Sequence, residues 1–237
     1  MRASFSERAR AVAWPSVVES LEQQGAALIP ALLTPEECAE LMALYADSER
    51  FRSKVVMQRH GYGRGEYQYF DYPLPPLVGA LREQMYSALV PLANRWHEAL
   101  GLETRFPDAL ADFSARCHAA GQARPTPLLL RYEAGDYNCL HQDLYGEHVF
   151  PLQLAVLLSK PLDDFEGGEL VLTEQRPRMQ SRPMVLTPRQ GDAVVFAVRH
   201  RPLQGTRGVY RVQMRHGVSR ILRGERYTLG IIFHDAT

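Results

Sequence analysis

Short apolar strand patterns, separated by turn residues, make up the second half of the chain. After residue 125 they run, in order, PLLLRYE, FPLQLAVLLS, GELVLTE, MVLTP, DAVVFAV, YRVQMRHGVSR and RYTLGIIFHD, with AGD, FEGG, PRQGD and RGE among the segments between them. Closely spaced short strands of this kind are typical of an antiparallel sandwich or barrel. The sequence therefore predicts a double-stranded β-helix, the jelly roll, over residues 126–237.

Helical patterns predominate in the first 125 residues. One ends at Gly25, a residue suited to a left-handed C-cap, and AALIP behind it is a short strand candidate. Another begins at Thr34, with Glu37 placed to complete a capping box. A longer helical pattern contains Pro91, where we expect a kink or a break. We predict an α+β protein in which residues 1–125 form a helical extension packed on the sheet, within the same domain as the jelly roll.

Between these helical patterns lies an aromatic and basic segment, FRSKVVMQRHGYGRGEYQYFDYPLP. Its character alternates along the chain, and Gly61, Gly63 and Gly65 lie in its middle. Alternation interrupted by glycines predicts a β-hairpin. The pattern fits a hairpin packed over the sheet as well as a lid that closes over a site.

Charge and cysteine content exclude several classes of protein. Lys+Arg and Asp+Glu number 27 each, so bulk charge does not bind this chain to nucleic acid or to an anionic membrane. Cys38, Cys117 and Cys139 have no zinc-type spacing, which predicts reduced thiols. The charged N-terminus does not resemble a signal peptide, and no apolar run is long enough to span a bilayer. We therefore expect a cytoplasmic protein without a membrane partner.

A histidine and an aspartate two residues apart, His141 and Asp143, follow the AGD turn. On a strand these two side chains point to the same face, and Gln142 points to the other. A histidine from a distant strand would complete a set of two histidines and one carboxylate, which leaves coordination positions of a ferrous ion open. The pair alone is a weak signal, because most short polar pairs bind no metal.

Four later histidines are candidates for the third ligand. His148 is too close in sequence to come from a separate strand, and His234 lies close to the C-terminus. His200 belongs to an arginine-rich segment, VRHRPLQG, which we expect to be a solvated turn. His216 ends the strand pattern VYRVQMRH and precedes a glycine. We therefore predict that His216 is the third ligand.

Ten residues after His216, Arg226 begins the strand pattern RYTLGIIF. Arg226, Thr228 and Gly230 share one face of this predicted strand. A guanidinium and a hydroxyl on an interior face form a site for a carboxylate. A buried arginine without an anion would be costly, so a bound carboxylate would explain Arg226. The alternative is a solvated arginine at the start of a strand.

His141-x-Asp143, His216 and Arg226-x-Thr228, in this order, resemble the Fe(II)- and 2-oxoglutarate-dependent dioxygenase superfamily. RYEAGDYNCLHQD resembles the strand that leads to the first histidine in those enzymes. FEGGELVL and RQGDAVVF are similar to the Gly-Gly-Glu and Gly-Asp turns of the prolyl-4-hydroxylase branch. The resemblance covers residues 126–235 in detail and the N-terminal helices more weakly.

The resemblance implies an enzyme with Fe(II), 2-oxoglutarate and O2 as cofactors. The implied Fe(II) ligands are His141, Asp143 and His216. The implied partners of the far carboxylate of 2-oxoglutarate are Arg226, Thr228 and Tyr132. The implied reaction oxidises a substrate C–H bond with release of succinate and CO2, and the protein positions the reactants rather than transferring protons.

Two substrate classes remain open. The spacing from His216 to Arg226 and the Gly-Gly-Glu turn favour the prolyl-hydroxylase-like branch, so we predict hydroxylation of a protein, peptide or amino-acid side chain. The alternative is oxidative demethylation of alkylated DNA or RNA, because an aromatic and basic segment ahead of RYEAGDYNCLHQD resembles AlkB-type enzymes. Arg220 to Arg226 also has the Arg-x5-Arg spacing of those enzymes, although their arginines lie further beyond the last histidine.

In the nucleic-acid alternative, the aromatic segment would bind the substrate. A base would stack on Tyr62, Tyr67 or Tyr69, while Arg59 and Arg64 would contact phosphate. A third alternative is a jelly roll whose metal centre is not catalytic. Arg226 separates that alternative from an enzyme, because nothing in such a site requires this residue unless 2-oxoglutarate binds.

Overall fold

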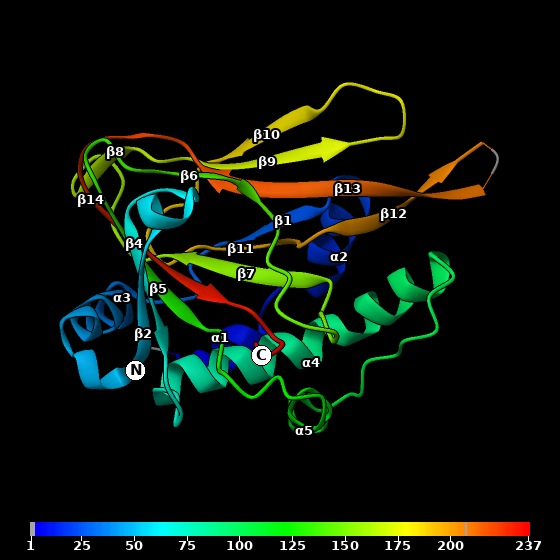
Figure 1. Cartoon of the computed structure of the whole chain (residues 1–237), viewed down its shortest axis with the longest axis horizontal. Coiled ribbons are helices and arrows are strands. Elements are labelled where there is room, and N and C mark those ends of the chain that lie inside the picture. The colour runs from blue at the N-terminus through cyan, green and yellow to red at the C-terminus, as the bar shows by residue number, and fades with distance from the viewer. Residues whose placement is uncertain (1–2, 207) are drawn as a thin grey trace.

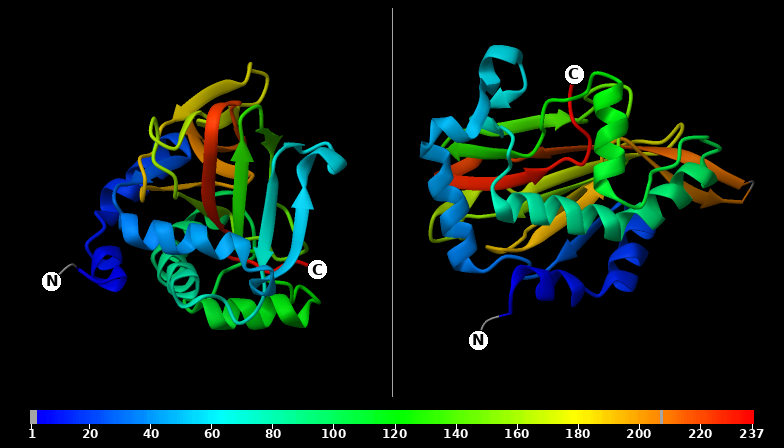
Figure 2. Two further views of the ribbon diagram at one scale, coloured as in Figure 1. Left: turned by 90° about the vertical axis from the view of Figure 1, so that its left-hand side faces the viewer. Right: turned by 90° about the horizontal axis from the view of Figure 1, so that it is seen from below.

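Two antiparallel sheets face one another in the computed structural model, which describes residues 3–206 and 208–237 (Figure 1). The larger sheet has the strand order β1-β11-β7-β14-β5-β4-β2, and β8 pairs with β14 at its side. The smaller sheet has the order β10-β9-β13-β6-β3, and β12 pairs with β13. Helices lie across the outer face of the larger sheet (Figure 2). This arrangement confirms the predicted α+β jelly roll.

The larger sheet contains strands from both halves of the chain. They are β1 (Ala26–Ile29), β2 (Phe51–Val56), β4 (Glu66–Phe70), β5 (Leu128–Glu133), β7 (Leu152–Leu157), β8 (Phe165–Gly167), β11 (Ala193–Ala197) and β14 (Ile221–Ile231). The smaller sheet is formed by β3 (Gly63–Arg64), β6 (Tyr137–His141), β9 (Leu170–Gln175), β10 (Arg182–Leu186), β12 (His200–Gly205) and β13 (Gly208–Val218).

The helices are α1 (Phe5–Arg10), α2 (Trp14–Gln24), α3 (Pro35–Ala43), α4 (Pro76–Ala99) and α5 (Leu110–Ala119), with short 3-10 turns at Leu44–Ala46, Ser48–Arg50 and Met57–His60. Thr34 and Glu37 form the predicted capping box of α3, and Gly25 is the left-handed C-cap of α2. The break predicted at Pro91 is wrong, because α4 continues through this residue. Pro91 faces solvent, whereas its neighbours Val90 and Leu92 are buried in the core, so packing holds the helix together.

Residues before 125 contribute strands as well as helices. β4 pairs with β5 along the larger sheet, and β1 pairs with β11 at its other side. The segment FRSKVVMQRHGYGRGEYQYF is a hairpin in which β2 and β4 are antiparallel partners, as its alternation predicted. These ladders support the proposal that residues 1–125 belong to the same domain as residues 126–237.

Two segments expected to be turns are strands. VRHRPLQG contains β12, whose pairing with β13 buries Arg201 completely, so the solvated turn predicted around His200 is wrong. The RGE segment lies inside β14, where Glu225 pairs with Glu133 of β5. The partner of the RGE segment lies far earlier in the chain, whereas the partner of β12 is the next strand in sequence, and in both places strand pairing overrides the local turn signals. No helix among the described residues is long and apolar enough to cross a membrane.

The two faces of β14 divide the molecule into a core and a site. Leu229 and Ile231 point toward the helices and belong to the main hydrophobic core, together with Tyr86, Phe113 and other residues of α4 and α5. Each large apolar side chain in such a core stabilises the fold by about 2–5 kcal/mol relative to alanine. Arg226, Thr228 and Gly230 alternate with these residues and line a pocket between the sheets, as the sequence predicted for this strand.

Candidate metal and cosubstrate site

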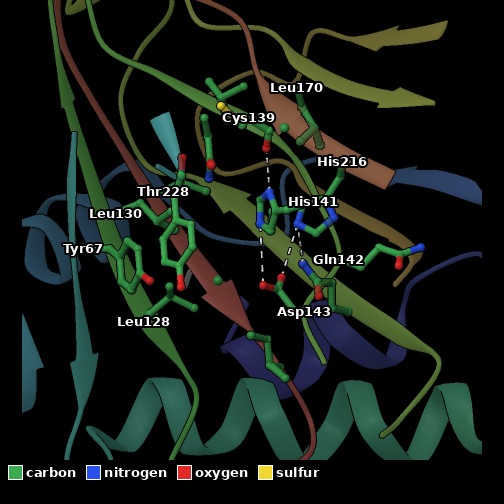
Figure 3. A pocket seen from close by; sticks show the side chains of 18 of the residues that line it. Tyr67, Leu128, Leu130, Cys139, His141, Gln142, Asp143, Leu170, His216 and Thr228 are labelled. Atoms are coloured by element: carbon green, nitrogen blue, oxygen red, sulfur yellow. Dashed lines mark hydrogen bonds and ion pairs between the residues drawn. The ribbon is translucent and has the colours of Figure 1, made fainter. Parts of the chain in front are cut away.

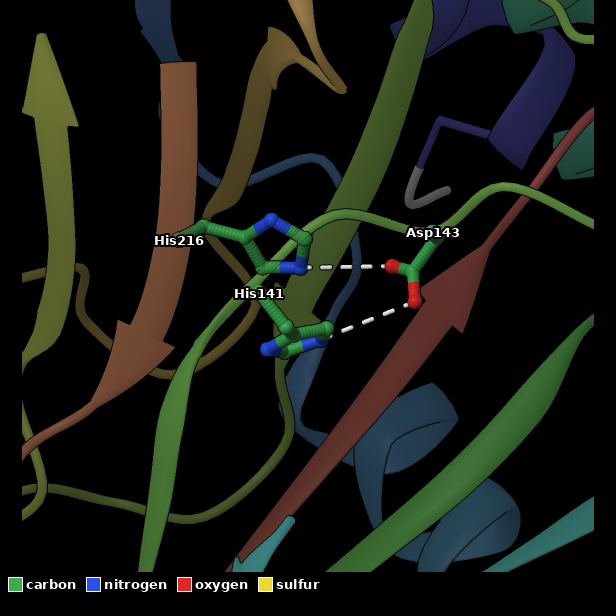
Figure 4. A group of neighbouring side chains, drawn as sticks. All are labelled: His141, Asp143 and His216. Carbon is green, nitrogen blue, oxygen red and sulfur yellow. Dashed lines mark ion pairs between the residues drawn. The ribbon is translucent and has the colours of Figure 1, made fainter. Parts of the chain in front are cut away.

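His141, Asp143 and His216 meet between the two sheets (Figure 4). His141 ends β6 and is directly paired with His216 of β13, which lies two residues before that strand ends. Asp143 follows β6. The potential ligand atoms of the three side chains lie within 4.8 Å of one another. Among the described residues, this is the one group of three or more such side chains close enough to hold a metal ion.

The protonation states of these residues suit a metal. Nδ1 of His141 lies 2.8 Å from the carbonyl oxygen of Cys139, to which it can only donate, so we assign the lone pair to Nε2. Burial and the neighbouring His141 lower the pKa of His216, which is therefore neutral at neutral pH. Burial acts to raise the pKa of Asp143, but its hydrogen bonds with His216 and Tyr145 hold it below its usual range. Neutral imidazoles and an ionised carboxylate are the forms that bind metal.

The Asp143 carboxylate faces both histidines. Its Oδ2 lies 3.2 Å from Nε2 of His216, and its Oδ1 lies 3.5 Å from Nε2 of His141. Tyr145 donates a hydrogen bond to Oδ1 at 2.7 Å, and Tyr69 donates to the hydroxyl of Tyr145 at 3.1 Å. Two tyrosines from different parts of the chain thus fix the orientation of the carboxylate. The sequence analysis missed Tyr145, whose position two residues after Asp143 was the available signal.

Gln153 of β7 is a second polar residue that the sequence analysis missed. Its side-chain amide lies 3.1 Å from Nε2 of His216, and its Oε1 has no protein partner among the described residues. The strand pattern LQLAVL offered one signal, because a glutamine interrupts an otherwise apolar strand. The buried amide places a polar group beside the predicted third ligand.

Arg226 lies at the other end of the same pocket and is 3% exposed. Its Nη1 donates to Oγ1 of Thr228 at 2.6 Å, and its guanidinium lies 5.7 Å from the ring centre of Tyr132. Its Nε has no partner in the described part of the chain. Burial lowers the pKa of Arg226 to about 10, so the group is still a cation at neutral pH. A buried cation with a free donor fits a carboxylate ligand.

Close packing holds the pocket wall around Arg226 and Tyr132. Tyr132 is fully buried, and its hydroxyl accepts a hydrogen bond from Asn138 at 3.3 Å. A Cβ on Gly65 would lie 2.8 Å from the Tyr132 ring, and a Cβ on Gly168 would lie 2.9 Å from Cδ of Arg226. Both glycines have positive φ angles, so a side chain at either position would strain the backbone as well as displace the site.

One cavity of about 380 Å³ joins the His141, Asp143 and His216 group to Arg226 (Figure 3). This volume is within the range of small-molecule sites. Three of the predicted substrate residues, Tyr62, Tyr67 and Tyr69, line the cavity. The fourth, Arg64, does not line it; its side chain is exposed and lies 3.9 Å from Asp136.

The other candidate histidines lie outside this cavity. His148 and His200 line a separate hollow on the surface. His234 is buried, and burial together with the charge of Arg82 lowers its pKa to about 4. Arg59 is exposed on the 3-10 turn before the Gly61–Gly65 region.

A family model for oxygenases matches residues 65–236, which include every residue of the site described above except Tyr62. The family is described as "Oxygenase, catalysing oxidative methylation of damaged DNA". The chain belongs to this family. Two uncharacterized proteins, from two strains of Mycobacterium tuberculosis, are each 50% identical to it over 167 residues, which cover 70% of this chain and 72% of theirs.

Solved structures show the same fold at low sequence identity. A prolyl-4-hydroxylase of Pseudomonas putida has a TM-score of 0.52 at 16% identity, with 94% of this chain and 99% of that chain covered. An oxidoreductase of the 2OG-Fe(II) oxygenase family from Burkholderia pseudomallei has a TM-score of 0.55 at 14% identity, covering 94% and 92%. A prolyl 4-hydroxylase of Phytophthora capsici has a TM-score of 0.58 at 16% identity, covering 100% and 67%.

The enzyme is therefore an oxygenase, an oxidoreductase, and it has the fold of a member of the 2OG-Fe(II) oxygenase family. This fold implies Fe(II), 2-oxoglutarate and O2 as cofactors. The residues present fit these groups. Two histidines and one carboxylate are a donor set that suits Fe(II). The unpartnered Nε of buried Arg226 supplies a donor for the acidic cosubstrate. The family assignment identifies an enzyme rather than a non-catalytic metal-binding module.

Proposed function

We propose that this enzyme oxidises N-alkyl groups on damaged nucleic-acid bases and thereby removes them. The observation that carries this proposal is the wall of the cavity next to the metal site. Tyr62, Tyr67 and Tyr69 line it, and Arg226 is the one lysine or arginine among the described residues that line the cavity. Flat aromatic side chains suit a base that has left its stack. The description of the family also favours a nucleic-acid substrate.

In this proposal His141, Asp143 and His216 hold Fe(II). When bound, Fe(II) and 2-oxoglutarate supply the oxidising chemistry, in which decarboxylation of 2-oxoglutarate to succinate is coupled to oxidation of a substrate C–H bond. Tyr145 keeps the carboxylate of Asp143 pointing at the metal position through its hydrogen bond to Oδ1. The strand pairing of His141 with His216 keeps the two imidazoles together.

Arg226 and Thr228 bind the far carboxylate of 2-oxoglutarate in this proposal, and Tyr132 closes the cavity beside it. Arg226 offers its free Nε to a carboxylate oxygen. Thr228 accepts from Arg226, so its own hydroxyl hydrogen is available for the second oxygen. Because the group is buried, water competes poorly for these donors.

Tyr67 and Tyr69 would contact the base inside the cavity, and Tyr62 would cover it at the mouth. Tyr62 is 51% exposed and stacks on His60, with ring centres 5.3 Å apart. Arg59 and Arg64 are exposed on the same hairpin, where they could reach phosphate groups outside the cavity. Insertion of an oxygen atom into an N-methyl C–H bond gives an N-hydroxymethyl group. That group breaks down to formaldehyde and the N–H base, so the reaction removes one carbon.

The test is product release from two substrate panels supplied with Fe(II) and 2-oxoglutarate. One panel holds N-methylated single-stranded DNA and RNA, and the other holds proline-containing peptides and free amino acids. We expect succinate and formaldehyde in equal amounts with the methylated nucleic acids. Succinate release stimulated by peptides alone, without formaldehyde, would overturn the proposal.

Variants of the metal site provide the controls for this assay. His216→Ala, Asp143→Ala and Asp143→Glu should each abolish turnover, because the first two remove a ligand atom and the third displaces it. Full turnover by His216→Ala would mean that another residue supplies the third ligand. Cys139→Ser, a change at an exposed residue at the cavity mouth, should leave the iron content of the enzyme unchanged.

Hydroxylation of a protein, peptide or amino-acid side chain is the second candidate. The observation in its favour is the Gly-Gly-Glu turn, which packs directly against the predicted cosubstrate anchor, since a Cβ on Gly168 would meet Cδ of Arg226. A turn of this kind resembles the prolyl-4-hydroxylase branch. The peptide panel tests this candidate, and hydroxylated product would be identified by a mass increase of one oxygen atom without loss of carbon.

A further inference from the structure

Two hollows on the protein surface meet at His200. The first, of about 540 Å³, lies between the C-terminal end of α4, the segment 144–151 and the start of β12. The second, of about 300 Å³, is lined by residues of β12 and β13 and by the loop that begins at the end of β9. In Figure 1 the C-terminal end of α4 and the β12–β13 arm both lie at the right-hand side, and Figure 2 shows them close together from below.

Arginines line both hollows, two in the first and three in the second. We refer to the following five residues as the arginine band: Arg116, Arg176, Arg178, Arg199 and Arg211. Among the described residues that line the two hollows, Glu147 is the one carboxylate. The band is thus strongly positive although the chain as a whole has a formal net charge of zero.

Little of this positive charge is neutralised by the protein itself. Within the described part of the chain, Arg178, Arg199 and Arg211 are exposed and make no ion pair. The nearby carboxylate of Glu174 is buried and already pairs with Arg176 at 2.7 Å and with fully buried Arg201. The side chains of Arg178, Arg199 and Arg211 are therefore available to an external anion.

The pKa of His200 is consistent with a positive electrostatic potential at the two hollows. Burial and the charges of Arg199 and Arg211 lower the pKa of His200 to about 4. His200 is therefore uncharged at neutral pH and contributes hydrogen-bonding atoms rather than charge. It lies at the junction of the two hollows, so the arginines on both sides act on one continuous surface.

The arginine band adjoins the active-site cavity through one short segment. Asp143 and Tyr145 line the cavity, whereas Leu144, Gly146 and Glu147 line the first hollow. Neighbouring residues of the same backbone thus face the two spaces alternately. A polymer with one group inside the cavity would cross this segment and come to the first hollow.

We propose that the arginine band binds the phosphate backbone of the nucleic acid whose damaged base enters the cavity. This proposal rests on the proposed function and assigns the strand a path from the metal site over residues 143–148 to the β12–β13 arm. Arginine suits this role because its guanidinium can donate two parallel hydrogen bonds to one phosphate. Phosphate contacts of this kind position the strand and make binding dependent on salt.

The test compares Arg199→Glu/Arg211→Glu with a control of equal charge change, Arg10→Glu/Arg50→Glu, at exposed arginines outside the band. Each variant is assayed with an N-methylated single-stranded oligonucleotide and with the corresponding methylated nucleoside, which has no phosphate. We expect kcat/KM for the oligonucleotide, relative to that for the nucleoside, to fall about tenfold or more in the band variant and to stay constant in the control.

A binding measurement provides an independent readout. Fluorescence anisotropy with unmodified single-stranded DNA over a range of salt concentrations should give a smaller salt dependence for Arg199→Gln/Arg211→Gln, with the slope reduced by about 1–2 for two lost phosphate contacts. These neutral substitutions at exposed positions also guard against misfolding, which thermal melts would reveal.

The outcomes separate the two proposals. If the wild-type enzyme turns over the methylated oligonucleotide and the band variant matches the control, the arginine band is wrong and the proposed function stands. If no methylated nucleic acid supports turnover, the proposed function is wrong, and the DNA-binding measurement still tests the band. Binding of an acidic peptide in preference to DNA at these residues would also overturn the band as a backbone site.

Discussion

Arg82 and Arg226 are both almost fully buried, with 2% and 3% of their surfaces exposed, but their surroundings differ. Arg82 of α4 donates to Asp235 at 2.6 Å, to the hydroxyl of Tyr72 at 2.8 Å and to two backbone carbonyls near the C-terminus at 3.0 Å. Arg226 donates to one hydroxyl, that of Thr228, and its Nε has no partner among the described residues.

We infer from this difference that Arg82 is a structural charge and that Arg226 is available to a ligand. A buried guanidinium is stable only when its donors and its charge are compensated. The chain itself compensates Arg82, which ties α4 to the C-terminal segment. Arg226 keeps a donor, Nε, without a partner in the described part of the protein, and a carboxylate would supply both the missing acceptor and the opposite charge. Removal of Arg82 should therefore damage the fold, and removal of Arg226 should damage cosubstrate binding.

The largest expected effect on stability is that of Arg82→Met. This change leaves the buried carboxylate of Asp235 with its strongest partner removed and should lower the free energy of unfolding by about 3–5 kcal/mol. Urea denaturation followed by circular dichroism measures it. The double variant Arg82→Met/Asp235→Asn should recover part of the loss, since it removes the uncompensated charge. Equal stability of wild type and Arg82→Met would contradict the structural role.

Arg226→Met should act on 2-oxoglutarate with little loss of stability. Truncation of one partner of a buried, hydrogen-bonded charge pair costs about 2–5 kcal/mol of binding energy. The apparent KM for 2-oxoglutarate should therefore rise about 30-fold or more, which steady-state succinate release measures. Arg226→Lys keeps the charge but loses the two parallel donors of the guanidinium. Its apparent KM for 2-oxoglutarate should therefore lie between those of the wild type and Arg226→Met. An unchanged KM in Arg226→Met would place the carboxylate elsewhere.

Ligand addition should stabilise the wild-type enzyme and distinguish the two arginines again. At a concentration 100 times Kd, 2-oxoglutarate added anaerobically with Fe(II) should increase the free energy of unfolding by about 2.7 kcal/mol. Thermal melts with and without the cosubstrate measure the shift. The same addition should increase the free energy of unfolding of Arg226→Met much less. For Arg82→Met the increase should equal that of the wild type, because its 2-oxoglutarate site is intact. Equal shifts in all three proteins would remove the distinction.

Tyr145→Phe should have a smaller effect than the changes at Arg82 and Arg226, because it removes one hydrogen bond and no ligand atom. A hydrogen bond to a charged group contributes about 1.5–3 kcal/mol, so iron affinity should fall roughly tenfold or more while 2-oxoglutarate still binds through Arg226. Titration of the apoenzyme with Fe(II) measures this change. Tyr69→Phe, one hydrogen bond further from Asp143, should have a weaker effect. A larger loss of iron affinity for Tyr69→Phe than for Tyr145→Phe would contradict this order of hydrogen bonds.

Local sequence signals predicted the residues that line the site, but not the residues that hydrogen-bond to the predicted metal ligands. The period-two pattern of RYTLGIIF assigned Arg226, Thr228 and Gly230 to one face, and the cavity contains all three. Gln153 was missed because it meets His216 only in the folded protein, whereas Tyr145 lies two residues from Asp143 and its spacing was not used. The expected turn around His200 was wrong because this segment pairs with β13, the next strand in sequence.

The sequence by itself determined the kinds of residue and the faces of the strands that carry them, because alternation and capping are local properties of the backbone. It therefore predicted the jelly roll, its His-x-Asp pair and the carboxylate-binding face of the last strand. Only the tertiary structure decided which residues meet. The pairing of His141 with His216, the incomplete compensation of Arg226, and the meeting of five arginines at two hollows all depend on contacts between segments distant in sequence.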